Sequence, residues 1–359
     1  MKKSIRTVCE VTTGTLTVGL DLGDRNSYAV VLDEAGEVIV EGKLRTRDQD
    51  LRRHFGGLRP MRVAIEAGTQ SMWVNRVLGE LGHEVIVANP RRLRLISENP
   101  TKQDRVDAEY LARLARMDPK MLHPIRHRGE DRQRDVQLLR SRQALMQCRT
   151  ALINHVRSAV KLFGERLPSC SADAFAARAV PKIPELLTGS LLPLLQEIAR
   201  MTRQLKRYDR KVEELCAKKY PETRHLLQIR GVGPLTALAF VVTLEHPARF
   251  RTSRSVGPFV GLCPGRKQSG DRDPERRIHK KGDRYLRQLL VTCGHYILGP
   301  FGKDCDLRRH GEKIARQGGK KAKKRAVVAV ARKLAVLMHH LWATEEMYDP
   351  LYNARKRAA

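Results

Sequence analysis

Two short apolar runs, each followed at once by a carboxylate, constrain the fold of this chain more than any other feature. The first, TVGL, precedes Asp21, and the second, VAI, precedes Glu66. Runs of this length are typical of buried strands. Asp104 and Asp107 lie three residues apart at the start of a helical pattern, so both fall on one helix face. Carboxylates at strand ends and on one helix face can converge into a pocket for Mg²⁺, and paired metal ions support in-line attack at phosphorus.

Strand and helix patterns surround these carboxylates. Strands are predicted over 16–22, 27–32, 38–44, 62–66 and 83–88, with a hairpin turn at 33–37, and helices over 69–81 and 105–117. Hairpin strands followed by alternating strand and helix indicate a mixed sheet with helices, an α/β layer. A first strand with an aspartate at its exit suits an RNase H-like core.

The charge of the chain points to a polyanionic partner. Among 359 residues there are 69 Lys+Arg against 39 Asp+Glu, a net charge of +30. Such an excess favours nucleic acid, because Lys and Arg displace counterions from phosphates. A membrane surface is the alternative, but no apolar run approaches the roughly 20 residues of a spanning helix. The seven cysteines include no C-x-x-C pair, which argues against structural zinc and for a reducing cytosol.

A heptad repeat predicts a helical middle region. A long polar helix is expected over 130–163 and a second over 191–218, despite Pro193. The apolar seam of the second helix, spaced alternately by three and four residues, consists of Leu191, Leu194, Ile198, Met201, Leu205, Tyr208, Val212 and Leu215. An intramolecular helix pair and a dimer-forming coiled coil both explain this seam.

The last third of the chain carries the signals for nucleic-acid binding. Arg230, Gly231 and Gly233 lie in a turn shaped like a helix-hairpin-helix, which would expose backbone N–H groups to a phosphate. A plain helix–helix turn is the alternative. Further phosphate contacts are expected from Arg266, Lys267, Arg276, Arg277, Lys280, Lys281, Arg284 and Arg287. A flexible basic clamp is predicted over 318–325, with Lys320, Lys321, Lys323 and Lys324, before a final helix over 326–343. For all these cations the alternative is a solvated basic face.

These motifs, in this order and spacing, resemble the DEDD transposases of bacterial insertion sequences, the insertion-sequence-110/1111 family. The shared motifs are GLDLG at 19–23, IEAG at 65–68, VANP at 87–90, KQDRVDA at 102–108, GVGP at 231–234, GLCP at 261–264 and QSG at 268–270. The resemblance covers about residues 15 to 345. Gln103 stands where Thr is usual and Arg230 where Pro is usual, and neither is a proposed catalytic group.

The resemblance implies a domain organisation and a partner set. It implies an RNase H/RuvC-like nuclease domain over 15–120, a helical coiled-coil region over 121–220 and a mainly helical transposase domain over 221–345, between a leader (1–14) and a tail (346–359). It further implies donor and target DNA, selected by a structured noncoding guide RNA that the element encodes. A homo-oligomer is expected, a dimer or a tetramer in synapsis, in the bacterial cytoplasm at the nucleoid.

The resemblance also implies the catalytic groups. It maps the family's four metal-binding acids onto Asp21, Glu66, Asp104 and Asp107, which would hold one or two Mg²⁺ ions, and its catalytic serine onto Ser269. A serine hydroxyl needs activation by a base or a metal. Ser269 is therefore expected to enter the acidic pocket and attack DNA there, in a composite site built from two domains.

Other interpretations of the same residues stay open. Without the resemblance, the four acids could be surface carboxylates paired with arginines, as Asp104 beside Arg105 illustrates, and Ser269 could belong to an ordinary Ser-Gly turn. A structure-selective RuvC-like nuclease or junction resolvase would use the acids alone, with water as the nucleophile. A non-catalytic nucleic-acid-binding protein on a nuclease fold is the third interpretation.

Overall fold

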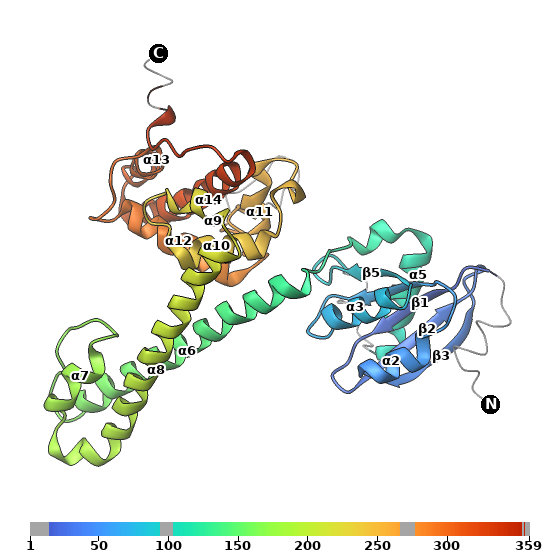
Figure 1. Cartoon of the computed structure of the whole chain (residues 1–359), viewed down its shortest axis with the longest axis horizontal. Coiled ribbons are helices and arrows are strands. Elements are labelled where there is room, and N and C mark those ends of the chain that lie inside the picture. The colour runs from blue at the N-terminus through green and yellow to red at the C-terminus, as the bar shows by residue number, and fades with distance from the viewer. Residues whose placement is uncertain (1–13, 94–102, 266–276, 354, 356–359) are drawn as a thin grey trace. The chain divides into compact units, whose positions relative to one another are not determined.

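The computed structural model of the chain describes residues 14–93, 103–265, 277–353 and 355. The chain divides into two compact units, Met1–Gly129 and Glu130–Ala359 (Figure 1). The finer division into a leader, three domains and a tail stays a prediction.

The first unit is built on one five-stranded sheet. Its elements are β1 (Thr17–Asp21), β2 (Asn26–Leu32), β3 (Val38–Arg45), α2 (Asp48–Phe55), β4 (Arg62–Glu66), α3 (Ser71–Glu80), β5 (Glu84–Ala88), α5 (Asp104–Met117) and the 3₁₀ helix η1 (Pro119–Leu122). The strand order is β3-β2-β1-β4-β5, with β1, β2 and β3 antiparallel and β1, β4 and β5 parallel. The prediction of a mixed α/β sheet is confirmed.

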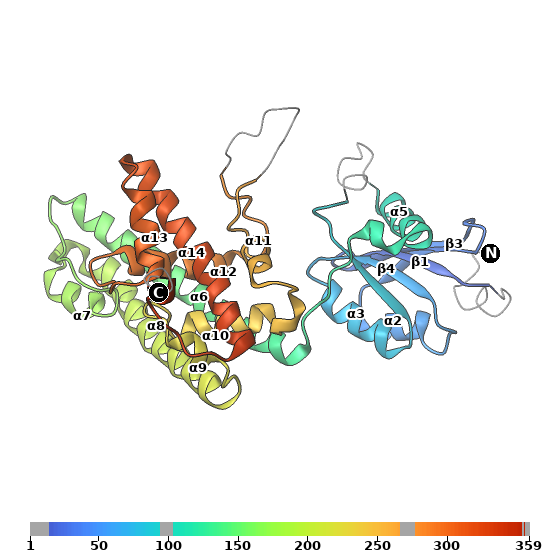
Figure 2. The same cartoon turned by 90° about the horizontal axis from the view of Figure 1, so that it is seen from above.

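Helices cover both faces of this sheet, α5 one face and α2 with α3 the other (Figure 2). The helix α5 lies unusually close to the central strand. A Cβ atom added at Gly19 would come within 1.8 Å of the carbonyl oxygen of Ala108. Glycine at this position therefore allows the backbone of α5 to pack directly on β1.

The second unit is helical throughout the part that the structure describes, apart from one isolated β-bridge. Its elements are α6 (Glu130–Lys161), α7 (Phe175–Ala179), η2 (Val180–Lys182), α8 (Glu185–Lys218), α9 (Thr223–Leu227), α10 (Pro234–Leu244), η3 (Pro247–Arg249), η4 (Ser253–Ser255), α11 (Val256–Phe259), α12 (Arg284–Leu298), α13 (Asp306–Ala315) and α14 (Gly319–Thr344). Within this unit, α6 and α8 pack along each other as a long antiparallel pair (Figure 1).

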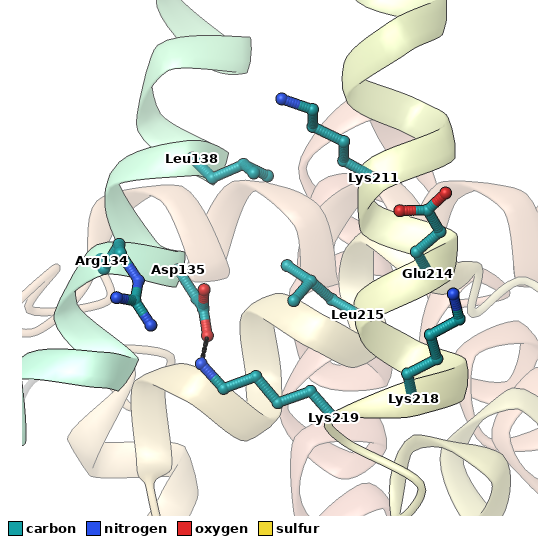
Figure 3. Close-up of a pocket in the computed structure, with 8 residues that line it drawn as sticks. All are labelled: Arg134, Asp135, Leu138, Lys211, Glu214, Leu215, Lys218 and Lys219. Carbon is teal, nitrogen blue, oxygen red and sulfur yellow. Dashed lines mark hydrogen bonds and ion pairs between the residues drawn. The ribbon is translucent and has the colours of Figure 1, made fainter.

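Buried polar contacts connect the N-terminal part of α6 to the C-terminal end of α8. The carboxylate of Asp135 accepts a hydrogen bond from Lys219 Nζ at 2.6 Å (Figure 3). It accepts another from Tyr220 Oη, also at 2.6 Å. Burial and the nearby Asp135 carboxylate raise the pKa of Tyr220, so the phenol stays protonated and donates. Further along the pair, Arg142 Nε donates to Asp209 at 2.6 Å.

The heptad seam of α8 is right in its period and partly wrong in its residues. Leu191, Ile198, Leu205 and Val212 are buried, whereas the seam positions between them are only half-buried. The buried positions on the other side of this stripe are Leu195, Thr202 and Cys216. At every second position of the predicted seam, the buried residue is therefore the one that follows the predicted residue, as with Leu195 instead of Leu194. The helix pair within one chain is present, and a coiled coil between two chains stays a prediction.

The prediction of a flexible basic clamp over 318–325 is wrong, because these residues begin a helix. Lys320, Lys321, Lys323 and Lys324 belong to the first two turns of α14, a single helix that continues to Thr344. Among the described helices, only α14 is long and apolar enough to cross a membrane. Its apolar side chains instead form the core of the C-terminal helices, where Val330, Leu334 and Met338 are fully buried.

Candidate nuclease site

Two of the predicted catalytic carboxylates end neighbouring strands at one edge of the sheet. In the parallel pair β1 and β4, Leu20 lies beside Ile65, so Asp21 and Glu66 follow at the same carboxyl end. Side chains two residues apart share a face of a strand. Asp21 thus shares the face of Gly19, which α5 covers, and Glu66 that of Ala64, which packs with residues of α5. Both carboxylates are half-buried.

The other two carboxylates lie in the first turn of α5, above the same edge. This helix runs antiparallel to β1, because at its far end Arg116 Nη2 donates to the carbonyl of Glu34, in the turn beyond the opposite end of β1. Asp107 directly precedes the residue that packs on Gly19 and is 5 % exposed, whereas Asp104 is exposed. The sheet and α5 therefore bring all four predicted residues to one end and one face.

These four residues have the right donor chemistry for a divalent cation, but their side chains do not converge. Carboxylate oxygens are the ligands that Mg²⁺ prefers. Among the described residues, no group of three or more His, Cys, Asp or Glu side chains is close enough to hold a metal ion. Like charges repel unless a cation lies between them. The placement on the backbone fits the predicted site, and the metal site itself stays a prediction.

The neighbouring strands add groups that the sequence did not single out. Tyr28 of β2 lies opposite Asp21, and Lys43 of β3 lies opposite Tyr28. Burial and the Glu41 carboxylate raise the pKa of Tyr28 against an opposing effect of Arg105, so its phenol remains a hydrogen-bond donor. Counting back from the hairpin turn at 33–37 would not have found Lys43, because the register of β2 and β3 shifts between Val31 and Leu32.

Arg105 does not neutralise its neighbour Asp104. Its guanidinium Nε donates to Glu41 of β3 at 2.6 Å instead. This ion pair holds the start of α5 against the sheet. The interpretation of Asp104 as the surface partner of Arg105 therefore finds no support in the geometry.

The predicted nucleophile lies outside the described residues. Ser269, Arg266, Lys267 and Arg276 all fall within 266–276, whose structure is not described. The residues on either side of this segment, 263–265 and 277–279, pair with each other in the second unit and form a stem. The amide of Gly265 donates to the carbonyl of Arg277 at 3.0 Å, and the amide of His279 donates to the carbonyl of Cys263 at 2.9 Å.

The basic residues after this stem divide into two groups. Arg277, Lys280, Lys281 and Arg284 are exposed, so the prediction that they contact phosphates stays open. Arg287 was also predicted to contact a phosphate, but its side chain is only 9 % exposed. Its Nη1 donates to the carbonyls of Val260 and Lys281, so the side chain fastens the stem to the fold.

The Gly-Val-Gly turn joins two short helices, α9 and α10, as predicted. Gly231 has a φ of +93°, a conformation that favours glycine. Gly233 is the exposed N-cap of α10, and Arg230 is exposed beside it. Lys320, Lys321, Lys323 and Lys324 are exposed at the start of α14. Phosphate binding at these positions stays a prediction.

Comparison with known proteins identifies the family. A family model for DEDD transposases of the IS110 type, described as a transposase, matches residues 18–164. A second model, described as transposase IS116/IS110/IS902 family, matches residues 223–298. The chain belongs to the IS110 family of transposases. The first match includes all four carboxylates of the sheet unit, and the second includes the Gly-Val-Gly turn and α12.

Individual transposases match most of the chain. The transposase for insertion sequence element IS1328 of Yersinia enterocolitica is 29% identical over 284 residues, 78% of this chain and 83% of the relative. A probable family 20 transposase of Pseudomonas aeruginosa is 27% identical over 93% of this chain and 98% of its own. The transposase for IS1111A of Coxiella burnetii is 27% identical over 92% of this chain and 90% of its own. Membership implies a DNA-processing enzyme with DNA as its substrate, and a DEDD family suggests a divalent metal.

Proposed function

We propose that this chain excises and inserts its own insertion sequence by Mg²⁺-dependent cleavage and exchange of DNA strands. In this proposal Asp21, Glu66, Asp104 and Asp107 hold one or two Mg²⁺ ions, and Ser269 is the nucleophile. The observation that supports it is the common placement of the four carboxylates, two at neighbouring strand ends and two on the helix turn above them.

The proposed reaction replaces one phosphodiester bond by another. Bound Mg²⁺ supplies neutralisation of the scissile phosphate and polarisation of the reacting oxygens. Ser269 Oγ bonds to phosphorus and loses its proton, while the bond from phosphorus to one deoxyribose oxygen breaks and that oxygen takes up a proton. A deoxyribose hydroxyl of the partner strand then attacks the phosphoserine and releases the serine. The phosphoserine conserves the energy of the broken bond, so no ATP is needed.

The partners in this proposal are donor DNA, target DNA and a structured guide RNA from the element. A net charge of +30 supports binding of more than one nucleic acid. A homo-oligomer, a dimer that becomes a tetramer in synapsis, would hold two duplexes together. We assign the contact between chains to the half-buried seam positions of α8, Leu194, Met201 and Tyr208.

The test is a search for a covalent protein–DNA adduct. Purified full-length protein is incubated with MgCl₂ and labelled DNA that spans the element junction, with and without co-expressed flanking RNA, and the products are denatured. The variants are Ser269→Ala and Asp104→Asn, with Glu37→Gln as the matched control. Glu37 is an exposed carboxylate in the β2–β3 turn, away from the carboxyl ends of β1 and β4.

The proposal expects an adduct in the wild type and in Glu37→Gln, only with RNA, and none in the other two variants. Cut DNA without an adduct, persisting in Ser269→Ala, would show instead a RuvC-like nuclease that uses water. Absence of any cleavage in the wild type under all conditions would favour the non-catalytic interpretation.

A further inference from the structure

A pocket without acidic residues lies at the end of β5, in the unit that contains the sheet. Its cavity measures about 390 Å³, and its lining consists of Asn89, Arg92, Lys120, His123, Pro124 and Ile125. Arg92 and Lys120 are exposed, and neither forms a salt bridge with a carboxylate of any residue that the structure describes. The pocket therefore carries positive charge that the described fold does not neutralise.

This pocket lies on the same edge of the sheet as the predicted nuclease site. Glu66 pairs with Ala88 at the end of β5. On the outer side of β5, the amide of Asn89 donates to the carbonyl of Leu122 at 3.0 Å, and the amide of Ile125 donates to that of Val87 at 2.9 Å. The segment 122–125 therefore extends the sheet by one more chain. Two strand spacings of about 4.8 Å separate it from Glu66, a distance of about 10 Å.

The walls of the pocket are fixed by contacts within the fold. Arg92 Nη1 lies 3.4 Å from His123 Nδ1, so the arginine of one wall meets the histidine of the other. His123 adopts a left-handed backbone conformation, with φ at +46°, which turns the chain after η1. The amide of Lys120 donates to Asp118 Oδ1 at 2.9 Å and fixes the start of η1. Both basic walls are thus part of the folded unit.

We propose that this pocket binds a phosphate of the DNA strand that is cleaved at the acidic edge, close in sequence to the scissile phosphate. Contacts from Lys and Arg to phosphates fix the register of a protein on DNA. The axial rise of about 3.4 Å per nucleotide in duplex DNA puts the contacted phosphate within about three nucleotides of the scissile phosphate. Arg92 and Lys120 are positioning residues here, and the proposal rests on the proposed function of the acidic edge.

A second cavity, in the helical unit, matches a phosphate less well. It lies between α6 and α8 and is lined by Arg134, Asp135, Leu138, Lys211, Glu214, Leu215, Lys218 and Lys219 (Figure 3). Two of these residues are acidic, and Lys219 is already paired with Asp135. Leu138 and Leu215 make part of its wall apolar. The charge in this cavity is therefore compensated locally, unlike that of the pocket at β5.

The test compares two double variants of the full-length protein that lose the same charge. Arg92→Gln with Lys120→Gln removes the pocket cations, and Arg47→Gln with Arg53→Gln removes two exposed cations at α2, a helix on the opposite face of the sheet. Binding of labelled junction DNA is measured without divalent metal over a range of salt concentrations. Because the pocket is proposed to hold one phosphate, the pocket variant should reduce the slope of log K against log salt by about 0.9, and the control should leave it unchanged.

Single neutral methylphosphonate linkages then locate the contact. At one or two positions near the cleaved bond, the neutral linkage should weaken wild-type binding about tenfold and weaken the pocket variant less than twofold. Equal weakening of both proteins at every position would overturn the proposal, and so would coupling that appears with labelled RNA but not with DNA. Wild-type protein that binds DNA without ever cleaving it would contradict the proposed function. In that case, the difference between the wild type and the pocket variant in their response to a neutral linkage would still show whether the pocket binds a phosphate.

Discussion

The helices α5 and α14 begin with opposite charges, although both start at the same kind of electrostatic site. The N-terminus of a helix carries a partial positive charge. The first turn of α5 contains Asp104 and Asp107, which complement that charge. The first two turns of α14 contain Lys320, Lys321, Lys323 and Lys324, together with Arg325 and without any acidic residue, and these oppose it.

The charges at the start of α5 stabilise the folded chain, whereas those at the start of α14 do not. Acidic residues at the start of α5 stabilise the helix by about 0.3–1 kcal/mol each, so their presence alone says little about catalysis. The cations at the start of α14 destabilise it by a similar amount, so the folded chain gains nothing from them. A polyanion bound there would reverse this effect. The function of the carboxylates must therefore be argued from their placement over the strand ends, and that of the lysines from their charge.

The largest effect is expected from separating α5 from the sheet with Gly19→Ala. The new Cβ would lie 1.8 Å from the carbonyl oxygen of Ala108, so the helix must move. Overpacking of this kind lowers the free energy of unfolding by about 3 kcal/mol. Denaturant unfolding and junction-DNA cleavage should both show the loss.

Gly42→Ala is the control for that substitution. It also lies in a strand of the sheet, and a Cβ added there meets nothing within 4 Å. Its stability should stay the same or rise slightly, since alanine restricts the unfolded chain. If Gly19→Ala were as stable as Gly42→Ala and still cleaved DNA, the close contact of α5 with β1 would not be what positions Asp104 and Asp107.

The sheet and the position of α5 could be predicted because their signals are local. The run VAI followed by Glu66 identified β4 to the residue, and the periodicity of 105–117 identified α5 to within one residue. In contrast, the prediction missed α2, whose buried residues are only Leu51 and Phe55 in a charged helix. Two apolar positions are too few to reveal a helical period.

The charges of the C-terminal unit were harder to interpret for a physical reason. A sequence shows how many arginines lie near one another, but not which of them the chain folds over. Arg287 is buried because Gly261 and Gly282 let the stem close over it: a Cβ at Gly261 would lie 2.0 Å from the carbonyl oxygen of Lys281. The lysine-rich start of α14 was predicted to be a flexible clamp, although lysine itself favours helices.

The second prediction concerns the lysines that oppose the positive end of α14. Alanine at Lys320, Lys321, Lys323 and Lys324 should reduce the salt slope of DNA binding by up to about 3.6 if all four contact phosphates. The same change should raise the free energy of unfolding by about 1 kcal/mol, because it removes cations from the helix N-terminus. Salt-dependent binding and denaturant unfolding measure the two effects on one protein.

The control for this variant removes four exposed cations from the middle of α8, where no helix end contributes. Alanine at Arg203, Lys206, Arg207 and Arg210 changes the net charge by the same amount. Its stability should not rise, and its salt slope should change less. A fall in stability for the α14 variant would show that its lysines stabilise the fold. The charges at the starts of α5 and α14 would then not differ in their effect on stability.

The smallest effect is expected at the other helix, from Asp104→Asn. Without divalent metal, the variant should lose about 0.5 kcal/mol of stability, because one complementary charge leaves the start of α5. With millimolar MgCl₂, the wild type and the Glu37→Gln control should gain about 1 kcal/mol, since an ion that binds only the folded state stabilises it. Thermal unfolding with and without MgCl₂ separates the two contributions. If Mg²⁺ stabilised Asp104→Asn as much as the wild type, the carboxylates of α5 would serve the helix alone, and the metal would have to be held without Asp104.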